Sequence, residues 1–167
     1  MVANMILSKA SAEKKLRRMA MEILEQHHSS SELLLVGIRQ NGWPIARKIQ
    51  AFLKEDFTGN LQVAALTIDK KSPSGIQLEP AVSCSGKTVI LVDDVANSGR
   101  TMLYALKPLL DAYPEKIQTL ALVARTHRSF PVALDFVGMS VSTSPEEYIT
   151  VDVLDDAVVG ASIQSRQ

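Results

Sequence analysis

The sequence predicts an α/β fold in which a mainly parallel central sheet is flanked by helices on both faces. Short apolar runs alternate with amphipathic helical segments along the chain, which is the pattern of parallel strands joined by helices. Several of these runs are continuously apolar, as is typical of strands buried on both faces. With 167 residues, of which 46% are hydrophobic, the chain is long enough for a real core, so we expect residues 1–167 to form a single domain.

The first half of the chain contains two predicted helix–strand pairs. Leu16, Met19, Ala20 and Ile23 recur at helical spacing and give the first helix one apolar face. Pro44 suits the first turn of the next helix. The predicted elements are a helix at 11–27, a strand at 33–38, a helix that begins near residue 44 and a strand at 61–68.

The second half begins with a polar segment, residues 69–80, that contains two prolines and a glycine and predicts a flexible loop or hairpin. The remaining predicted elements are strands at 88–92, 117–123, 134–137 and 148–153, and a helix at 101–113. Polar segments at 39–42, 69–75, 93–101 and 125–128 each follow a predicted strand. If these strands are parallel, the four segments meet at one edge of the sheet, where α/β proteins bind ligands.

The most informative segment is 89–101, which passes from an apolar strand through a polar loop into a helix. Asp93 and Asp94 follow the strand, and carboxylates accept hydrogen bonds from sugar hydroxyls. The loop consists of Asn97, Ser98, Gly99, Arg100 and Thr101. It offers backbone N–H groups, hydroxyls and a helix N-terminus to a phosphate, so the segment predicts a sugar phosphate site. The alternative is an ordinary strand–loop–helix with a capping serine and two solvated acids.

This segment resembles the phosphoribosyl diphosphate signature of the type I phosphoribosyltransferases. That signature is an apolar strand, two acids, three variable residues and Thr-Gly-x-Thr, and here Ser98 replaces the first threonine. The resemblance implies the fold of that family, with a small hood and a flexible loop. It also implies that Asp93 and Asp94 hold the ribose, that residues 97–101 hold the 5′-phosphate, and that Mg²⁺ binds through the diphosphate rather than through dedicated protein ligands.

Other segments take roles from the same resemblance. The loop after the first core strand holds pyrophosphate in that family, and here it consists of Arg39, Gln40, Asn41 and Gly42. The flexible loop of the family closes with a basic residue, for which Lys70 and Lys71 are the candidates. In the hood, Tyr148 is expected to stack on the base and Ile149 to offer main-chain groups to it. The candidate catalytic residues are therefore Arg39, Lys70, Asn97 and the acid pair Asp93 and Asp94.

Two positions in the sequence narrow the choice of nucleobase. The hypoxanthine-guanine enzymes carry a lysine where Ala124 stands and an aspartate where Asn97 stands, and this chain has neither. The chain is more similar to the bifunctional uracil phosphoribosyltransferases that also regulate pyrimidine operons by attenuation. It departs from that branch at Asn41, at Ala124 and at Asp69-Lys70, where an arginine, an aspartate and a Tyr-Arg pair are usual. The expected reaction is therefore transfer to uracil, giving UMP and pyrophosphate.

Two alternatives stay open. One is a nucleotide-sensing, RNA-binding regulator of pyrimidine genes with little or no catalysis. The residues that such a regulator could use for RNA are Lys14, Arg17, Arg18, His127 and Arg128. The net charge of zero gives no global attraction toward nucleic acid, and basic residues on a helix are more often solvated surface. The other alternative is a phosphoribosyltransferase for hypoxanthine, guanine or xanthine.

The remaining expectations concern location and assembly. A single cysteine, no apolar run of membrane-spanning length and no signal-peptide pattern lead us to expect a cytoplasmic protein without a membrane partner. The family resemblance implies a homodimer or a higher homo-oligomer.

Overall fold

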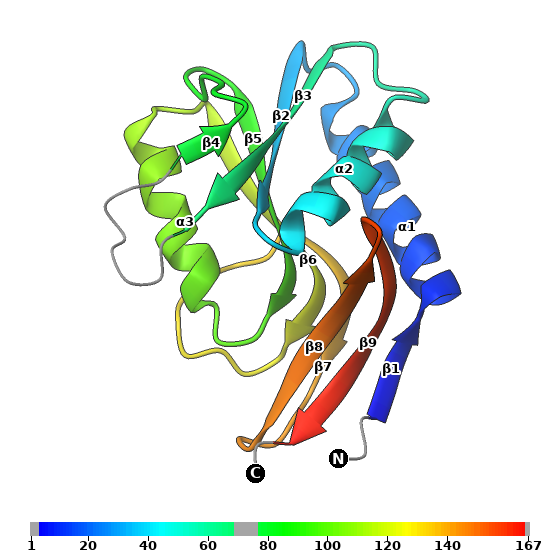
Figure 1. The fold of residues 1–167 in the computed structure, drawn as a ribbon. Coiled ribbons are helices and arrows are strands. Elements are labelled where there is room, and N and C mark those ends of the chain that lie inside the picture. Colours follow the sequence, from blue (N-terminus) through cyan, green and yellow to red (C-terminus); the bar gives the residue numbers. More distant parts are fainter. Residues whose placement is uncertain (1–3, 69–76, 166–167) are drawn as a thin grey trace.

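The computed structural model describes residues 4–68 and 77–165, which form two sheets and three helices (Figure 1). The larger sheet has the strand order β4-β3-β2-β5-β6-β7. Its strands are β2 (Glu32–Ile38), β3 (Asn60–Thr67), β4 (Gln77–Glu79), β5 (Thr88–Ala96), β6 (Lys116–Arg125) and β7 (Phe136–Val141). All neighbours are parallel except β3 and β4, which are antiparallel. The predicted α/β fold with a mainly parallel sheet is therefore confirmed.

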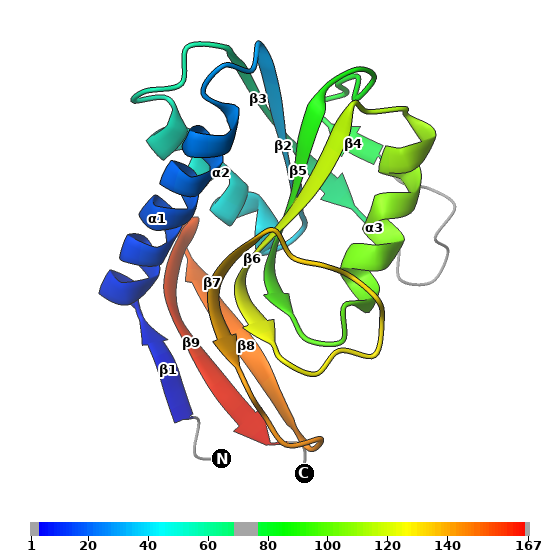
Figure 2. The ribbon, with the colours of Figure 1, turned by 180° about the vertical axis from the view of Figure 1, so that it is seen from behind.

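The helices cover both faces of this sheet. α1 (Lys9–His27) and α2 (Gly42–Leu53) pack on one face, and α3 (Arg100–Asp111) packs on the other, as the two opposite views show (Figures 1 and 2). Each face has its own cluster of buried apolar side chains. α1 begins two residues before the predicted position because the side chain of Ser8 accepts a hydrogen bond from Ser11 N (3.2 Å) and caps the helix.

A smaller antiparallel sheet forms a hood at the carboxyl ends of the core strands. Its order is β1 (Asn4–Ser8), β9 (Ala157–Ser165) and β8 (Glu147–Leu154). The hood brings both ends of the described chain together, as Figure 1 shows. The sequence predicts β8, at 148–153, but neither β1 nor β9. Both contain polar or small residues among their apolar ones, and their pairing joins residues about as far apart as the chain allows.

Other elements also differ from the sequence prediction. The strand predicted at 134–137 lies later, at Phe136–Val141, and its parallel pairing with β6 begins at Phe136 opposite Leu120. β5 continues past the predicted end at residue 92, since its pairing with β6 extends to Ala96 opposite Ala124. Of the flexible loop or hairpin predicted at 69–80, residues 69–76 lie outside the described residues, and Gln77–Glu79 form β4, which pairs with β3. Among the residues that are described, none of the helices is long and apolar enough to cross a membrane.

The core makes a direct prediction about stability. Phe136 is 1% exposed and is among the largest fully buried side chains. Replacing it with alanine should lower the free energy of unfolding by about 3–5 kcal/mol, because the change removes buried apolar contacts and leaves a cavity. Leu110→Ala is the matched control, since Leu110 is 60% exposed on α3, and it should cost less than about 1 kcal/mol. Urea denaturation of both variants measures the difference, and equal losses would contradict this description of the core.

Candidate functional site

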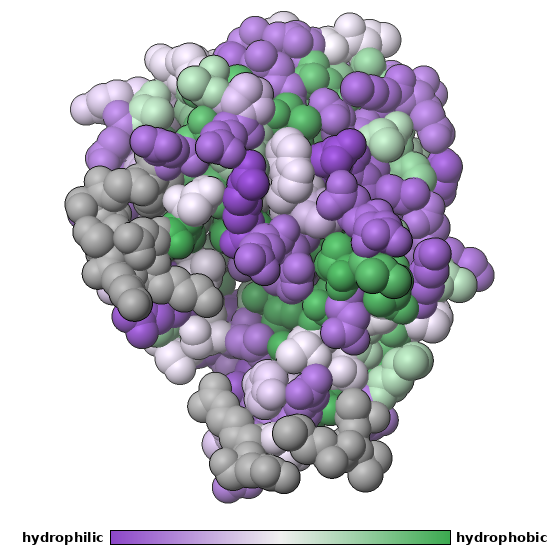
Figure 3. Space-filling view, viewed as in Figure 1, coloured by the Kyte–Doolittle hydropathy of each residue, from purple (hydrophilic) through white to green (hydrophobic). Residues whose placement is uncertain are grey.

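A cavity of about 670 Å³ lies between the carboxyl ends of the core strands and the hood. The loop after β2, the end of β3, the end of β5, the first residues of α3 and the hood strand β8 all line it. Hydrophilic residues cover much of the middle of the molecular face shown in Figure 3. Of the predicted site residues, the lining includes Arg39, Gln40, Asn41, Asp93, Asp94, Asn97, Thr101 and Ile149.

The acid pair lies within β5 rather than after it. Asp93 is 8% exposed, and its Oδ1 accepts a hydrogen bond from Asp94 N (2.9 Å), while Asp94 Oδ1 accepts one from Val95 N (2.8 Å). Burial, and then the neighbouring Asp94 carboxylate, raise the pKa of Asp93 well above its ordinary value. The strand thus holds one carboxyl group that resists ionisation beside a second one that is only partly buried, and both face the cavity.

The loop that opens α3 has the geometry expected of an anion-binding turn. Ser98 Oγ accepts a hydrogen bond from Arg100 N (3.2 Å), and Gly99 has a φ of 81°, a left-handed conformation that favours glycine. The carbonyl of Ser98 accepts hydrogen bonds from Ser129 N and Phe130 N (3.1 and 3.0 Å). The segment before β7 therefore fixes the backbone of this loop and holds the first N–H groups of α3 in place.

The side chains of this loop are divided between two sides. Asn97 and Thr101 line the cavity, whereas Arg100 is exposed and its guanidinium lies over the ring of Tyr104, 5.6 Å from the centroid. A phosphate at this loop would therefore meet backbone N–H groups and hydroxyls, with the Arg100 charge directed along α3 instead.

The loop after β2 packs tightly against the end of β5. A Cβ on Gly42 would lie 2.5 Å from the carbonyl oxygen of Val92, and a Cβ on Gly37 would lie 2.7 Å from that of Gly42. Only glycine allows such a close approach of two backbones. The peptide bond between Arg39 and Gln40 is cis, and Arg39 Nη2 contacts Glu79 Oε2 at 2.6 Å on β4. Arg39 thus lies at the cavity with an acidic neighbour already present.

Two asparagines join these loops to the hood. Asn97 Nδ2 donates to the carbonyl of Ile149 (3.1 Å), and Ile149 N donates to Asn97 Oδ1 (3.2 Å). Asn41 Nδ2 donates both to Asp94 Oδ2 (2.9 Å) and to the carbonyl of Val151 (3.1 Å). The sequence predicts ligand contacts for both asparagines, but it does not predict their hydrogen bonds to the hood. The available signal was that these two positions depart from the resembled families.

The other predicted residues have different surroundings. Tyr148 does not line the cavity, and its hydroxyl donates to Gln164 Oε1 on β9 (3.0 Å). The cavity is also lined by residues that the sequence does not predict to be part of the site, namely Thr67, Ile68, Thr150 and Val151. Lys70 and Lys71 lie outside the described residues.

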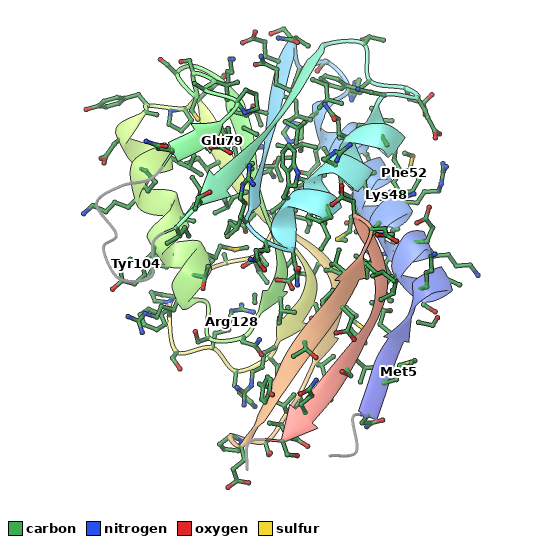
Figure 4. The ribbon with its side chains drawn as sticks, viewed as in Figure 1. Met5, Lys48, Phe52, Glu79, Tyr104 and Arg128 are labelled. Carbon is green, nitrogen blue, oxygen red and sulfur yellow. The ribbon has the colours of Figure 1, made fainter. Side chains whose placement is uncertain are left out.

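The basic residues do not form one patch. Arg17 pairs with Glu55 (3.2 Å) and lies over the ring of Phe52, and Arg18 donates to the carbonyls of Val137 and Gly138 (3.0 and 2.7 Å). Figure 4 shows Phe52 on α2 next to α1, far from Arg128 near the beginning of α3. Lys14 and His127 are exposed.

Nothing in the part of the chain that the structure describes gathers three His, Cys, Asp or Glu side chains at one metal position. The cavity offers the carboxyl groups of Asp93 and Asp94, of which Asp94 is the more accessible. Such a donor set fits Mg²⁺ that is held mainly by substrate phosphates, since Mg²⁺ commonly keeps one or two carboxylate ligands beside phosphate and water.

Comparisons with known proteins agree with this geometry. The phosphoribosyl transferase domain model matches residues 2–156. The "Bifunctional protein PyrR" of Pelotomaculum thermopropionicum is 36% identical over 156 residues, covering 87% of this chain and 86% of the relative. The protein of the same name from Chloroflexus aurantiacus is 36% identical over 170 residues, covering 92% and 93%.

Solved structures show the same fold at low identity. A hypoxanthine-guanine phosphoribosyltransferase from Bacillus anthracis has a TM-score of 0.73 at 16% identity and covers 97% of this chain and 98% of that chain. The hypoxanthine phosphoribosyltransferase of Trypanosoma cruzi has a TM-score of 0.79 at 13% identity and covers 98% and 97%. The matched domain, the fold and the relatives together show that the chain belongs to the type I phosphoribosyltransferase family, in the branch of the PyrR proteins.

Proposed function

We propose that residues 1–167 act as one domain that transfers the phosphoribosyl group of phosphoribosyl diphosphate to uracil, giving UMP and pyrophosphate. The observation that carries this proposal is the convergence of three features on one cavity: the acid pair Asp93–Asp94, the loop that opens α3, and the edge of the hood strand β8. These features match the three parts of the donor and acceptor, which are a ribose, a phosphate and a planar base.

The acid pair is assigned to the ribose. Carboxylate oxygens accept hydrogen bonds from the 2′- and 3′-hydroxyls, and a charged acceptor makes such bonds stronger. Asp94 is the more accessible of the two and accepts a hydrogen bond from the Asn41 amide, which fixes its orientation. Asp93 fixes the backbone of Asp94, because its Oδ1 accepts a hydrogen bond from Asp94 N.

The departing pyrophosphate is assigned to the loop after β2. As the bond to the anomeric carbon breaks, the sugar gains positive charge and the leaving group gains negative charge, so groups that are already oriented lower the barrier. Arg39 supplies positive charge at this loop, and the backbone N–H groups and hydroxyls of residues 98–101 anchor the 5′-phosphate. Mg²⁺ bound to the diphosphate supplies further neutralisation of the leaving group. The Arg39–Glu79 pair must rearrange or share its guanidinium for Arg39 to take this role.

Uracil is favoured over purines by residues of this chain and by its relatives. Ala124 and Asn97 stand where the purine enzymes are expected to carry a lysine and an aspartate, and Ala124 is buried and apolar. The solved purine enzymes share the fold at 13–17% identity, whereas the curated relatives at 32–36% identity carry the PyrR name. The base site is therefore proposed to accept a pyrimidine.

A turnover panel tests this proposal. Purified protein is offered phosphoribosyl diphosphate and Mg²⁺ with uracil, orotate, hypoxanthine, guanine or xanthine, and pyrophosphate release is measured. We expect turnover with uracil. Turnover with purines alone would refute the choice of base, and tight UMP binding without turnover would favour a nucleotide-sensing regulator instead. RNA binding is measured in parallel across salt concentrations, because phosphate contacts weaken as salt rises.

Replacing Asp94 with asparagine tests the ribose assignment. We expect affinity for phosphoribosyl diphosphate to fall about tenfold to a hundredfold, because hydrogen bonds to a charged acceptor are lost. Isothermal titration calorimetry measures the affinity. Asp152→Asn is the matched control, since Asp152 is an exposed carboxylate on β8, and it should leave the affinity unchanged. Unchanged affinity in Asp94→Asn would show that the ribose lies elsewhere.

The pKa of Asp93 predicts a pH dependence of stability. Because folding raises this pKa above its ordinary value of 3.8, the contribution of Asp93 to stability is present below that value and is lost as the pH rises through the folded pKa. Asp93→Asn removes this loss, so the free energy of unfolding of the variant minus that of the parent should increase by at least about 1 kcal/mol from pH 4 to pH 8.

Urea denaturation at several pH values measures this difference. Asp111→Asn is the control, since Asp111 is an exposed carboxylate at the end of α3, and its difference should change less with pH. A difference for Asp93→Asn that stays level or decreases over this range would contradict the raised pKa.

A further inference from the structure

We propose that Asn97 is an internal competitor of the nucleobase: its carboxamide occupies the N–H and C=O of Ile149 in the ligand-free chain, and the base displaces it on binding. The inference rests on the proposed function for the presence of a base in this cavity. It adds a positioning residue and a conformational exchange that the proposed reaction alone does not require.

The free edge of the hood strand faces the cavity. β8 is the outer strand of the hood sheet, and β9 pairs with it on one side only. Ile149 and Val151 line the cavity, are 2% and 6% exposed, and lie two residues apart, so their main-chain groups point to the same side. Buried main-chain groups without partners are costly, which means that this edge needs hydrogen-bonding neighbours.

Asn97 supplies the neighbour that a further strand would otherwise supply. Its amide donates to the carbonyl of Ile149 and its oxygen accepts from Ile149 N, at 3.1 and 3.2 Å. One side chain thus satisfies both main-chain groups of Ile149 at once. The contact joins residues 52 positions apart and connects the phosphate loop directly to the hood.

Asn41 bonds to the next cavity-facing residue of the same edge, Val151, but only as a donor. Its Nδ2 donates to the carbonyl of Val151 and to Asp94 Oδ2. The proposed ribose acid and the hood edge therefore share one amide group. Since Asn41 offers only its donor to β8, it holds the hood against the core without occupying the donor–acceptor pair of Ile149.

The carboxamide has the same hydrogen-bonding groups as the edge of an oxo-base. Uracil carries N3–H beside a carbonyl, and hypoxanthine and guanine carry N1–H beside a carbonyl, so each offers one donor next to one acceptor. Such an edge can replace Asn97 at Ile149 without loss of a hydrogen bond on the protein.

The first test uses the ligand-free protein. Amide hydrogen exchange of Ile149 is measured by NMR in the parent protein and in Asn97→Ala, and we expect exchange in the variant to be faster by about tenfold or more. Asn60→Ala is the matched control, because Asn60 is an exposed asparagine at the beginning of β3, and it should leave the rate unchanged. Equal rates in the parent and in Asn97→Ala would overturn the inference whatever the enzyme's activity.

The second test uses ligands that differ only in the base. UMP should bind to Asn97→Ala about threefold to tenfold more tightly than to the parent, because no competing contact must be broken. Ribose 5-phosphate, which has no base, and UMP methylated at N3, which has no donor, should show no such gain. Weaker binding of UMP, or equal changes for UMP and ribose 5-phosphate, would overturn the competitor role.

A second variant guards against failure of the alanine variant to fold. Asn97→Ser keeps a neutral polar side chain that is too short to satisfy both main-chain groups of Ile149, so it should strengthen UMP binding in the same direction. If UMP binds to none of these proteins, the choice of uracil is refuted and IMP, which carries the same N–H beside a carbonyl, replaces UMP in the comparison. The exchange rate of Ile149 decides the ligand-free contact in either case.

Discussion

The pairing of β5 with a parallel neighbour on each side is the constraint on which the site depends. This strand lies between β2 and β6, and its ladder with β6 continues to Ala96, past both acids. Asp93 and Asp94 therefore belong to a rigid strand, and Asp93 is buried at the cost of its ionisation. The loop after β2 can pack against the end of this strand because Gly42 allows contact with the carbonyl of Val92. The acids, the pyrophosphate loop and the beginning of α3 thus take their positions from one central strand.

The hood is the second part of the site, and its attachment is mostly polar near the cavity. Core and hood meet there through the amides of Asn41 and Asn97, which bond to main-chain groups of β8. Hydrogen bonds of this kind contribute only about 1 kcal/mol each in net terms, so they can be exchanged for bonds to a ligand. An apolar contact of the same area would resist such exchange. The chemistry of the contact therefore suits a surface that opens and closes around a substrate.

The sequence predicts the core better than the hood for physical reasons. The strands β2, β5 and β6 contain long apolar runs that are buried on both faces, and such runs are visible in one sequence. β1 and β9 are not visible in this way, because their pairing is decided by contacts across the whole chain. The two acids and Thr101 were expected at the site, and all three line the cavity. The orientation of Arg100 toward Tyr104 and the contacts of Tyr148 depend on tertiary packing, which local spacing does not encode.

The two asparagines show how departures from a family pattern acquire meaning only in three dimensions. In the sequence, Asn41 and Asn97 are 56 positions apart by number and belong to different loops, so each reads as a separate loss of a charged group. In the structure they reach the same edge of β8, at residues two positions apart. A charged side chain at position 97 would have to be desolvated beside the main chain of the hood, at a cost that an amide avoids. The two asparagines therefore form one neutral interface that joins the hood to the acid pair and to the loop that opens α3.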